Sequence, residues 1–428
     1  MIRQISMSKI ASQPETSDDD AQSQRGCVVY VTPDCTDSAV QKRAHGFVSV
    51  GMRLVSFSFR RTRYNVDFVP DWPNIELGIT TERRLLTRVF VFLRSLWVIH
   101  DHRRTWREAT MLYARNLDLA LLALTAKAIT RSPAPFVYEV LDIHPATTKR
   151  GIRGALLRWL ERRVLARSQL LVVSSPAFLR NYFLPTQRYQ GKSFLLENKW
   201  PSAAMSALTK KIPYELSEQE PKWSIGWFGN IRCPQSLEIL TELADALPQR
   251  VRIYIRGCAS LLGERKLMDV IGDRENMIFE GEYCAPRDLP AIYSKVHFNW
   301  CADFCGGKNS LWLLPNRLYE GGYFGIPALA IGSHETGRVV QQRQLGISLE
   351  TPVAEHLCDV LSKMTFDQYV RLRRRIESLP ETSFVDHGDL GRLVRTMTQP
   401  EHGLGQEHGV GAMHAAGEFR HDGVRQDR

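Results

Sequence analysis

The sequence contains no uninterrupted apolar run of the roughly 20 residues that a helix needs to cross a bilayer. Its first 24 residues are polar and include no apolar segment typical of a secretory signal peptide. The eight cysteines are scattered over 428 residues, which is not the spacing of a disulfide framework. Together these absences disfavour membrane-spanning and secreted proteins, and they predict a cytoplasmic protein with reduced thiols.

Metal-binding motifs are also missing. Cys301 and Cys305 are close in the sequence, but no second cysteine pair or histidine cluster accompanies them to complete a zinc site. No convincing Asp-x-Asp motif lies between the two halves of the chain. We therefore predict no metal site and no cofactor. Residues 1–25 and 399–428 contain few large apolar side chains, and we expect them to be disordered tails.

Positive charge is concentrated in the first half of the chain. The formal net charge is +10, and residues 27–199 contain 27 Lys and Arg against 13 Asp and Glu. The rest of the chain is therefore slightly acidic. This asymmetry predicts that the first half meets an anionic partner, which can be a lipid surface, a nucleic acid or an acidic substrate.

Strands and helices are predicted to alternate along both halves. The predicted strands, which are short apolar and β-branched runs, are 27–31, 52–59, 136–143 and 170–174, then 223–228, 251–256, 277–280, 296–300 and 327–331. A proline-containing stretch without clear periodicity, 201–221, is the predicted linker. The pattern predicts an α/β fold with two Rossmann-like domains, 26–200 and 222–398, which face each other across a cleft.

Two arginine-rich helices are predicted in the first domain, at 82–100 and 149–167, with apolar residues at helical spacing. Basic amphipathic helices that carry Trp suit an anionic membrane surface, although each helix alone is equally well explained as a cover for the sheet. The arginines that we expect at the membrane surface are Arg84, Arg88, Arg94, Arg153, Arg158 and Arg162. No recognisable nucleic-acid-binding motif is present, so we expect no nucleic-acid partner.

The stretch at 309–327, NSLWLLPNRLYEGGYFGIP, places Glu320 before Gly321 and Gly322. A carboxylate can accept hydrogen bonds from two ribose hydroxyls, and a helix N-terminus with small residues lets a diphosphate approach the backbone N–H groups. This segment resembles the donor site of GT-B glycosyltransferases, in particular the large retaining family four.

Further segments resemble that family in the same order along the chain. They are WFGNIR at 227–232, IRG at 255–257, GEY at 281–283 and ERRVLARSQLLVVSSPAFLRNYF at 161–183. The resemblance covers most of residues 27–394 and points to enzymes that build bacterial exopolysaccharides of the succinoglycan type. It implies the GT-B architecture, with an acceptor domain followed by a domain that binds a UDP-sugar.

The resemblance also implies which residues bind the donor. We predict donor contacts from Gly229, Asn230, Arg232, Arg256, Lys308, Asn316, Arg317, Glu320, Gly321 and Gly322. Two features depart from the family pattern: Trp312 stands where a first glutamate is frequent, and Gln235 stands where a lysine is usual. Neutralisation of the diphosphate is therefore assigned to the predicted arginines and Lys308, because arginine can bind phosphate with two hydrogen bonds.

On the acceptor side, Asp142 and His144 follow the predicted strand at 136–143, and ligands bind at the carboxyl ends of parallel strands. Both are candidate catalytic residues. His144 would contact the donor sugar or help to deprotonate the acceptor hydroxyl, and an ordinary surface histidine is an equally open reading. Asp34 is a candidate acceptor contact, and Lys42 and Arg43 are candidate ligands of an acceptor diphosphate, unless the three serve only the fold.

The sequence therefore predicts a metal-independent hexosyltransferase at the inner face of the plasma membrane. Its predicted partners are a UDP-sugar, with glucose as the first candidate, a lipid-linked oligosaccharide acceptor and the anionic membrane surface. The family resemblance implies that the anomeric configuration is retained. Two alternatives stay open, namely a GT-B nucleotide-sugar epimerase and a non-catalytic homologue that binds sugar nucleotides, the second suggested by Trp312.

Overall fold

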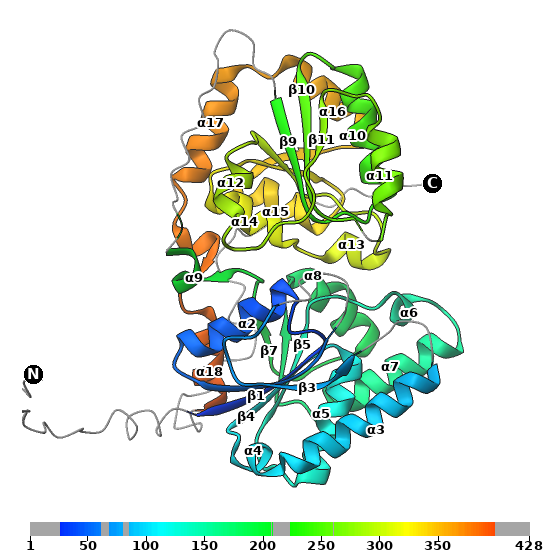
Figure 1. Ribbon diagram of the computed structural model, residues 1–428, viewed down its shortest axis with the longest axis vertical. Helices are drawn as coiled ribbons and strands as arrows, with labels where there is room; N and C mark the ends of the chain where they lie inside the picture. Colours follow the sequence, from blue (N-terminus) through cyan, green and yellow to red (C-terminus); the bar gives the residue numbers. More distant parts are fainter. Residues whose placement is uncertain are drawn as a thin grey trace, which may run out of the picture.

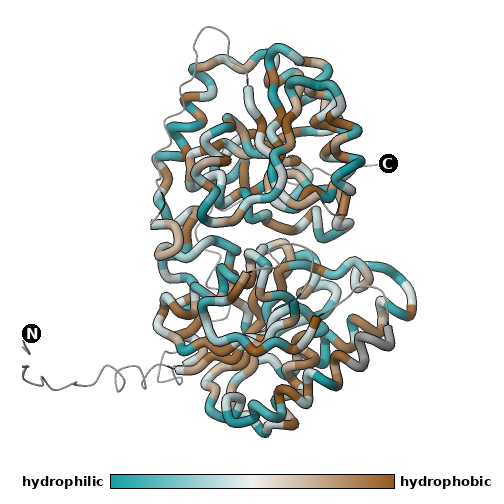
Figure 2. Tube along the Cα trace, in the orientation of Figure 1, coloured by the Kyte–Doolittle hydropathy of each residue, from teal (hydrophilic) through white to brown (hydrophobic). Residues whose placement is uncertain are grey.

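The computed structural model describes residues 26–60, 68–79, 85–206, 208, 223–259 and 261–398, and of residues 85–90 it describes the backbone alone. The two predicted tails and most of the predicted linker lie outside these residues. Within them the chain forms two α/β domains, one above the other in Figure 1. Figure 2 shows apolar segments concentrated along the central strands of each domain. The predicted pair of Rossmann-like domains is confirmed.

The first domain is built on a seven-stranded sheet. Its strands are β1 (Cys27–Thr32), β2 (Arg53–Arg60), β3 (Asn74–Ile79), β4 (Met111–Arg115), β5 (Phe136–Val140), β6 (Leu170–Val173) and β7 (Ser193–Leu195). Their order is β3-β2-β1-β4-β5-β6-β7, with parallel pairing throughout. The central strands β1, β4 and β5 are buried at every residue, as expected for parallel strands covered on both faces.

Helices cover both faces of this sheet. One face carries α3 (Leu85–Asp101), α4 (Arg103–Glu108), α5 (Leu117–Thr130), α7 (Ile152–Leu165) and the π-helix η1 (Leu179–Gln187). The opposite face carries α2 (Ser38–Ser49) and α18 (Asp389–Thr398). The short helices α6 (Pro145–Thr148) and α8 (Pro176–Phe178) lie in the connections after β5 and β6.

The second domain has a six-stranded parallel sheet. Its strands are β9 (Trp223–Asn230), β10 (Val251–Cys258), β11 (Met277–Phe279), β12 (Phe298–Trp300), β13 (Ala328–Ile331) and β14 (Gly346–Leu349), in the order β11-β10-β9-β12-β13-β14. One face packs against α10 (Pro234–Ala246), α11 (Glu264–Ile271), α16 (Val353–Lys363) and α17 (Phe366–Glu377). The other packs against α12 (Leu289–Tyr293), α14 (Asn316–Tyr323) and α15 (Glu335–Arg343).

The chain crosses between the domains more often than the sequence predicts. At the first crossing, β8 (Trp200–Pro201) leads into α9 (Ser202–Ser206), and β8 pairs with β15 (Val385–Asp386), which follows the 3-10 helix η2 (Glu381–Ser383). The last helix, α18, then returns to the first domain, where Leu390 and Leu393 pack with Val40 and Phe47. The predicted assignment of residues up to 398 to the second domain is therefore wrong for α18, because its apolar side completes the core of the first.

Candidate active site

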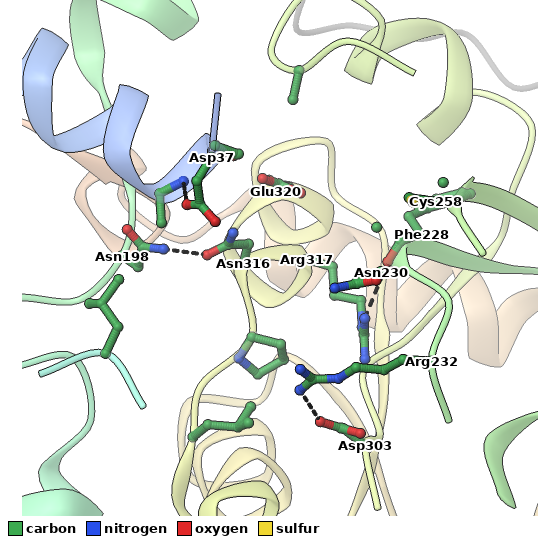
Figure 3. A pocket seen from close by; sticks show the side chains of 18 of the residues that line it. Asp37, Asn198, Phe228, Asn230, Arg232, Cys258, Asp303, Asn316, Arg317 and Glu320 are labelled. Carbon is green, nitrogen blue, oxygen red and sulfur yellow. Dashed lines mark hydrogen bonds and ion pairs between the residues drawn. The ribbon is translucent and has the colours of Figure 1, made fainter. Parts of the chain in front are cut away.

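A cleft of about 370 Å³ lies between the two domains, at the carboxyl ends of both sheets. Its first-domain wall consists of the start of α2, the loops that follow β5 and β6, and Asn198. Its second-domain wall consists of the ends of β9 and β10 and of residues from the segments 282–285, 302–303 and 313–317, together with Arg232, Cys233 and Glu320. Carboxyl ends of parallel strands are where ligands bind in such sheets, so this cleft is the candidate active site (Figure 3).

The floor of the cleft is glycine backbone. Gly229 and Gly257 stand side by side at the ends of β9 and β10, with φ angles of 97° and 137°. A Cβ atom on Gly257 would lie 1.8 Å from the carbonyl oxygen of Gly229, so no larger residue fits there. Gly229 and its neighbour Asn230 line the cleft, where the sequence predicted a donor contact.

Two of the predicted cations lie in the cleft (Figure 3). Arg317 donates to the carbonyl oxygens of Phe228, at 3.2 Å, and Ala302, at 2.9 Å. Arg232 forms an ion pair with Asp303 at 2.7 Å and keeps 37% of its side chain exposed. Burial alone would raise the pKa of Asp303, but the Arg232 guanidinium outweighs this effect and holds the pKa below its ordinary value. The cleft therefore offers fixed positive charge for an anionic ligand.

Glu320 lines the cleft from α14, together with Asn316 at the first position of that helix. Because α14 begins at Asn316, Glu320 lies within the helix and not at its start. Its Oε1 atom accepts hydrogen bonds from Lys42 Nζ and from Trp200 Nε1, both at 3.1 Å. The prediction that Lys42 binds an acceptor diphosphate is therefore wrong, because this buried lysine is already paired with Glu320.

Gly321 and Gly322 do not line the cleft. Both are buried in α14, where a Cβ atom would lie 2.6 Å from the Asn299 side chain and 2.2 Å from the Phe384 ring, respectively. The predicted contact of these glycines with the diphosphate is wrong, because both are needed for the packing of α14 against its own domain.

Arg256 and Lys308 also lie outside the cleft lining. Arg256 donates to the carbonyl oxygens of Gly281 and Glu282 and pairs with Glu280, at the edge of the sheet. Lys308 is exposed at the start of α13 (Lys308–Trp312), with its ammonium over the Trp312 ring. The structure therefore corrects the prediction of donor contacts from these two cations.

On the acceptor wall, Asp142 lines the cleft and His144 does not. Asp142 Oδ1 accepts a hydrogen bond from Asn309 Nδ2 at 2.7 Å. Although this side chain is open to the cleft, the surrounding protein desolvates its carboxyl group and raises the pKa above the ordinary value. His144 is exposed and caps α6, because its Nδ1 accepts from the Ala146 N–H. His144 is therefore not positioned for the catalytic role that the sequence predicted.

Asp34 and Arg43 are buried structural residues. Asp34 Oδ1 accepts from the backbone N–H and the hydroxyl of Thr36, which fixes the turn after β1. Arg43 shares Glu139 with Arg115, in ion pairs of 2.7 and 2.9 Å beneath α2. The predictions of an acceptor contact from Asp34 and of a diphosphate ligand in Arg43 are wrong, because neither side chain reaches the cleft lining.

Several residues of the cleft were not predicted from the sequence. Asp37 caps α2 by accepting from the Ala39 N–H at 2.8 Å, and the Asp-Ser step before a helical stretch is a recognisable cap signal. Asn198 donates to Asn316 Oδ1 at 2.5 Å, and among the described residues its buried Oδ1 has no hydrogen-bond partner. No local pattern marks Asn198, because its partner belongs to the other domain.

Cys233, Asp303 and Cys305 form a small cluster at the edge of the cleft. Their sulfur and carboxylate atoms all lie within 4.8 Å of one another, a spacing that a metal ion can bridge. Both Asp303 oxygens already have partners, since Oδ2 pairs with Arg232 and Oδ1 accepts from the Cys305 N–H. Cys301, which is close to Cys305 in the sequence, is not part of this cluster and is buried in the core of the second domain. The absence of a metal site stays a prediction.

The predicted membrane-facing helices lie on one face of the first domain, where α5 contacts both α3 and α7. Large apolar side chains stand in solvent there: Trp97 is 72% exposed, Ile152 89% and Trp159 47%. Arg94, Arg153 and Arg162 are exposed, and Arg158 is partly held by the carbonyl oxygens of Thr147 and Lys149. Arg84 and the side chain of Arg88 lie outside the described residues. In the described part of the chain no helix combines the length and apolarity needed to span a bilayer.

Comparison with known sequences identifies a relative that matches most of the chain. The chain is 34% identical to the succinoglycan biosynthesis protein ExoL of Rhizobium meliloti over 375 residues, which is 86% of this chain and 93% of that protein. No protein-family model matches the sequence.

Comparison with solved structures gives the fold. The structure of Anabaena Alr3699/HepE in complex with UDP and glucose superposes with a TM-score of 0.62 at 13% identity, over 87% of this chain and all of that one. A glycosyltransferase from Rickettsia africae superposes with a TM-score of 0.60 at 13% identity, over 87% of this chain and 98% of that one. Because both identities are low, the likeness shows only the architecture, which is GT-B.

Proposed function

The chain is a GT-B glycosyltransferase of the family of the succinoglycan biosynthesis protein ExoL, and we propose that it transfers a hexose from a UDP-sugar to a lipid-linked oligosaccharide during assembly of an exopolysaccharide repeat unit. Glucose is the first candidate for the hexose. The observation that carries the proposal is the composition of the cleft, where a glycine floor, the Glu320 carboxylate and two arginines converge on the donor-domain wall. The epimerase and the non-catalytic homologue are not favoured by the comparisons.

The donor wall suits a nucleoside diphosphate. Arg317 and Arg232 supply positive charge next to backbone at Gly229 that a phosphate can approach closely. Glu320 supplies an acceptor for ribose hydroxyls. Support for UDP comes from Anabaena Alr3699/HepE, a protein of the same architecture whose structures contain UDP or UDP-glucose.

The proposed chemistry relies on positioned charge. The two arginines stabilise the diphosphate as it leaves the sugar, so that no metal ion is needed. Asp142, on the opposite wall, is the proposed group that receives the proton of the acceptor hydroxyl, because its raised pKa brings it closer to the working pH than an ordinary carboxylate. Retention of the anomeric configuration is proposed from the family that the sequence resembles.

The acceptor would reach the cleft from the membrane. The exposed tryptophans and arginines of α3 and α7 belong to the same domain as Asp142, so docking of that face would place the acceptor wall near lipid headgroups. We therefore place the enzyme at the inner face of the plasma membrane, where nucleotide-sugar donors are available.

The test is reconstitution. Membranes from a deletion strain should accumulate a lipid-linked oligosaccharide that is one sugar short, and the purified protein with UDP-glucose should extend it by one hexose in a mass spectrum. Extension only with another UDP-hexose would change the assigned sugar and leave the proposed reaction class intact. No extension with any UDP-hexose, or conversion of the UDP-sugar without an acceptor, would refute the proposal.

A further inference from the structure

Lys42 is a buried lysine with a purely internal set of partners. It lies on α2 with 1% of its side chain exposed, and its ammonium donates to Glu320 Oε1 at 3.1 Å and to the carbonyl oxygen of Asn198 at 3.3 Å. The same ammonium lies 4.8 Å from the centre of the Trp200 ring. Burial lowers the pKa of Lys42, and the Glu320 carboxylate opposes this effect.

The contact joins the two domains. Lys42 belongs to the acceptor domain through α2, and Glu320 belongs to the donor domain through α14, 278 residues later in the chain. Both side chains are almost completely buried, with 1% and 5% exposed. Because its two partners belong to different domains, the pair exists only while the domains are in contact.

The two carboxylate oxygens of Glu320 have different surroundings. Oε1 accepts from Lys42 and from Trp200 Nε1. Among the described residues, no hydrogen bond is made to Oε2, and the side chain borders the cleft. A carboxylate oxygen has two lone pairs and accepts readily from hydroxyl donors. One oxygen is thus held by the protein, and the other is left for a ligand.

We propose that Lys42 is a positioning residue for the nucleotide donor: from the acceptor domain it fixes Glu320 Oε1, so that Oε2 is presented to a ribose hydroxyl. This inference rests on the proposed nucleotide-sugar function and deepens it. Its consequence is a coupling between domain contact and donor affinity, because the carboxylate is correctly placed only when α2 and α14 meet.

The test uses UDP and 2′,3′-dideoxy-UDP as probes, each titrated calorimetrically into the full-length protein. The wild type should bind UDP about tenfold or more tightly than the dideoxy analogue, because only UDP can donate ribose hydroxyls to the charged carboxylate. Lys42→Met should lose most of this preference, as should Glu320→Gln. A merely structural role for Lys42 would weaken both probes equally.

A double variant isolates the route through Glu320. If Lys42 acts by holding that carboxylate, Lys42→Met should not change the affinity for either probe in a Glu320→Gln background. The double variant also removes both buried charges, so its affinities for the two probes can be measured even if Lys42→Met alone folds poorly. Arg180→Met is the matched control: Arg180 pairs with Glu335 across the domains at 2.8 Å, outside the cleft lining, and its loss should leave the preference intact.

The outcomes separate the two proposals. Failure of the wild type to bind UDP would overturn the proposed function, and the role of Lys42 with it. If the wild type prefers UDP and Lys42→Met keeps that preference, the inference about Lys42 is wrong while the proposed function stands. Additive losses in the double variant would likewise exclude an action of Lys42 through Glu320.

Discussion

Asn309 of the donor domain fastens the acceptor loop that carries Asp142. Its Nδ2 donates to Asp142 Oδ1 at 2.7 Å, and its Oδ1 accepts from the backbone N–H of Ile143 at 2.8 Å. Both hydrogen bonds join α13 to the loop after β5. The position of the proposed proton acceptor therefore depends on the contact between the domains.

Asp142→Asn is expected to retain UDP binding and to lose transfer by about two to four orders of magnitude, because an amide cannot take the acceptor proton. The substitution keeps an oxygen that can accept from Asn309. Single-turnover rates with the lipid-linked acceptor and calorimetric UDP titration measure the two effects separately. Unchanged transfer would remove Asp142 from the mechanism.

The same variant should be more stable than the wild type at pH 7. The folded protein raises the pKa of Asp142 above its ordinary value of 3.8, so the folded state loses stability as the pH rises from that value through the raised pKa. Asn carries no charge and avoids this loss. Thermal melts should show the gain at pH 7 and its disappearance as the pH falls below the ordinary aspartate range. An equal gain at all pH values would point to packing as its cause.

The buried charges beneath α2 make a second stability prediction. Burial alone would raise the pKa of Glu139, but Arg115 and Arg43 outweigh it and hold the pKa below its ordinary value. The stabilisation is therefore present above the ordinary glutamate range and is lost as the pH falls through the lowered pKa. Glu139→Gln leaves two buried guanidinium groups without an anion and should destabilise the first domain by about 3–5 kcal/mol in denaturant unfolding at pH 7. A loss of unfolding free energy below about 1 kcal/mol would contradict the prediction that Glu139 compensates the two buried guanidinium groups.

The arginines of the donor domain can be separated by their positions. Arg232→Met should weaken UDP binding about tenfold or more and leave binding of uridine unchanged, because its guanidinium lies in the cleft where a diphosphate would be neutralised. Arg256→Met is the matched control, since Arg256 is held by carbonyl oxygens outside the cleft lining. Equal losses of UDP affinity in both variants would indicate a general charge effect.

The sequence predicted the two sheets because parallel strands are buried on both faces and so appear as short β-branched runs. It also located Gly229, Arg317 and Glu320 in the cleft through an ordered set of local segments. It could not predict the partners of Lys42 and Arg43, which lie 278 and 96 residues away along the chain. Asp142 and His144 follow the same strand, and only the path of the loop after that strand decides that Asp142 faces the cleft and His144 does not.

The placement of α18 was unpredictable for a related reason. An amphipathic helix has an apolar side to bury, but its sequence does not say which sheet it covers. In the structure that side meets Val40 and Phe47 of the first domain. Gly321 and Gly322 illustrate the same limit, because a glycine needed for close packing and one needed for a phosphate look alike in sequence.

Metal independence gives a direct test of the proposed chemistry. If Arg317 and Arg232 supply the charge that stabilises the leaving diphosphate, transfer should survive EDTA with less than a twofold loss of rate. Cys305→Ser, which replaces the exposed member of the Cys233–Asp303–Cys305 cluster, should leave transfer unchanged as well. Complete loss of turnover in EDTA, restored by magnesium or manganese, would require a different mechanism.

The last prediction concerns the membrane. The purified protein should sediment with vesicles that contain anionic lipid at low salt and should be released as salt rises, because surface charge is screened. Arg153→Glu changes the local charge by two units, and each unit near the surface contributes about 1 kcal/mol, so vesicle affinity should fall about tenfold or more. Trp97→Ser should weaken binding even at low salt, since this side chain is 72% exposed on α3 and can enter the headgroup region.

Arg265→Glu, on α11 of the other domain, is the matched control for charge and should leave binding unchanged. An equal loss of vesicle affinity in the Arg265 variant would mean that net charge, rather than the face formed by α3 and α7, controls attachment. Vesicle binding that does not depend on lipid charge or on salt concentration would exclude an anionic surface as the partner.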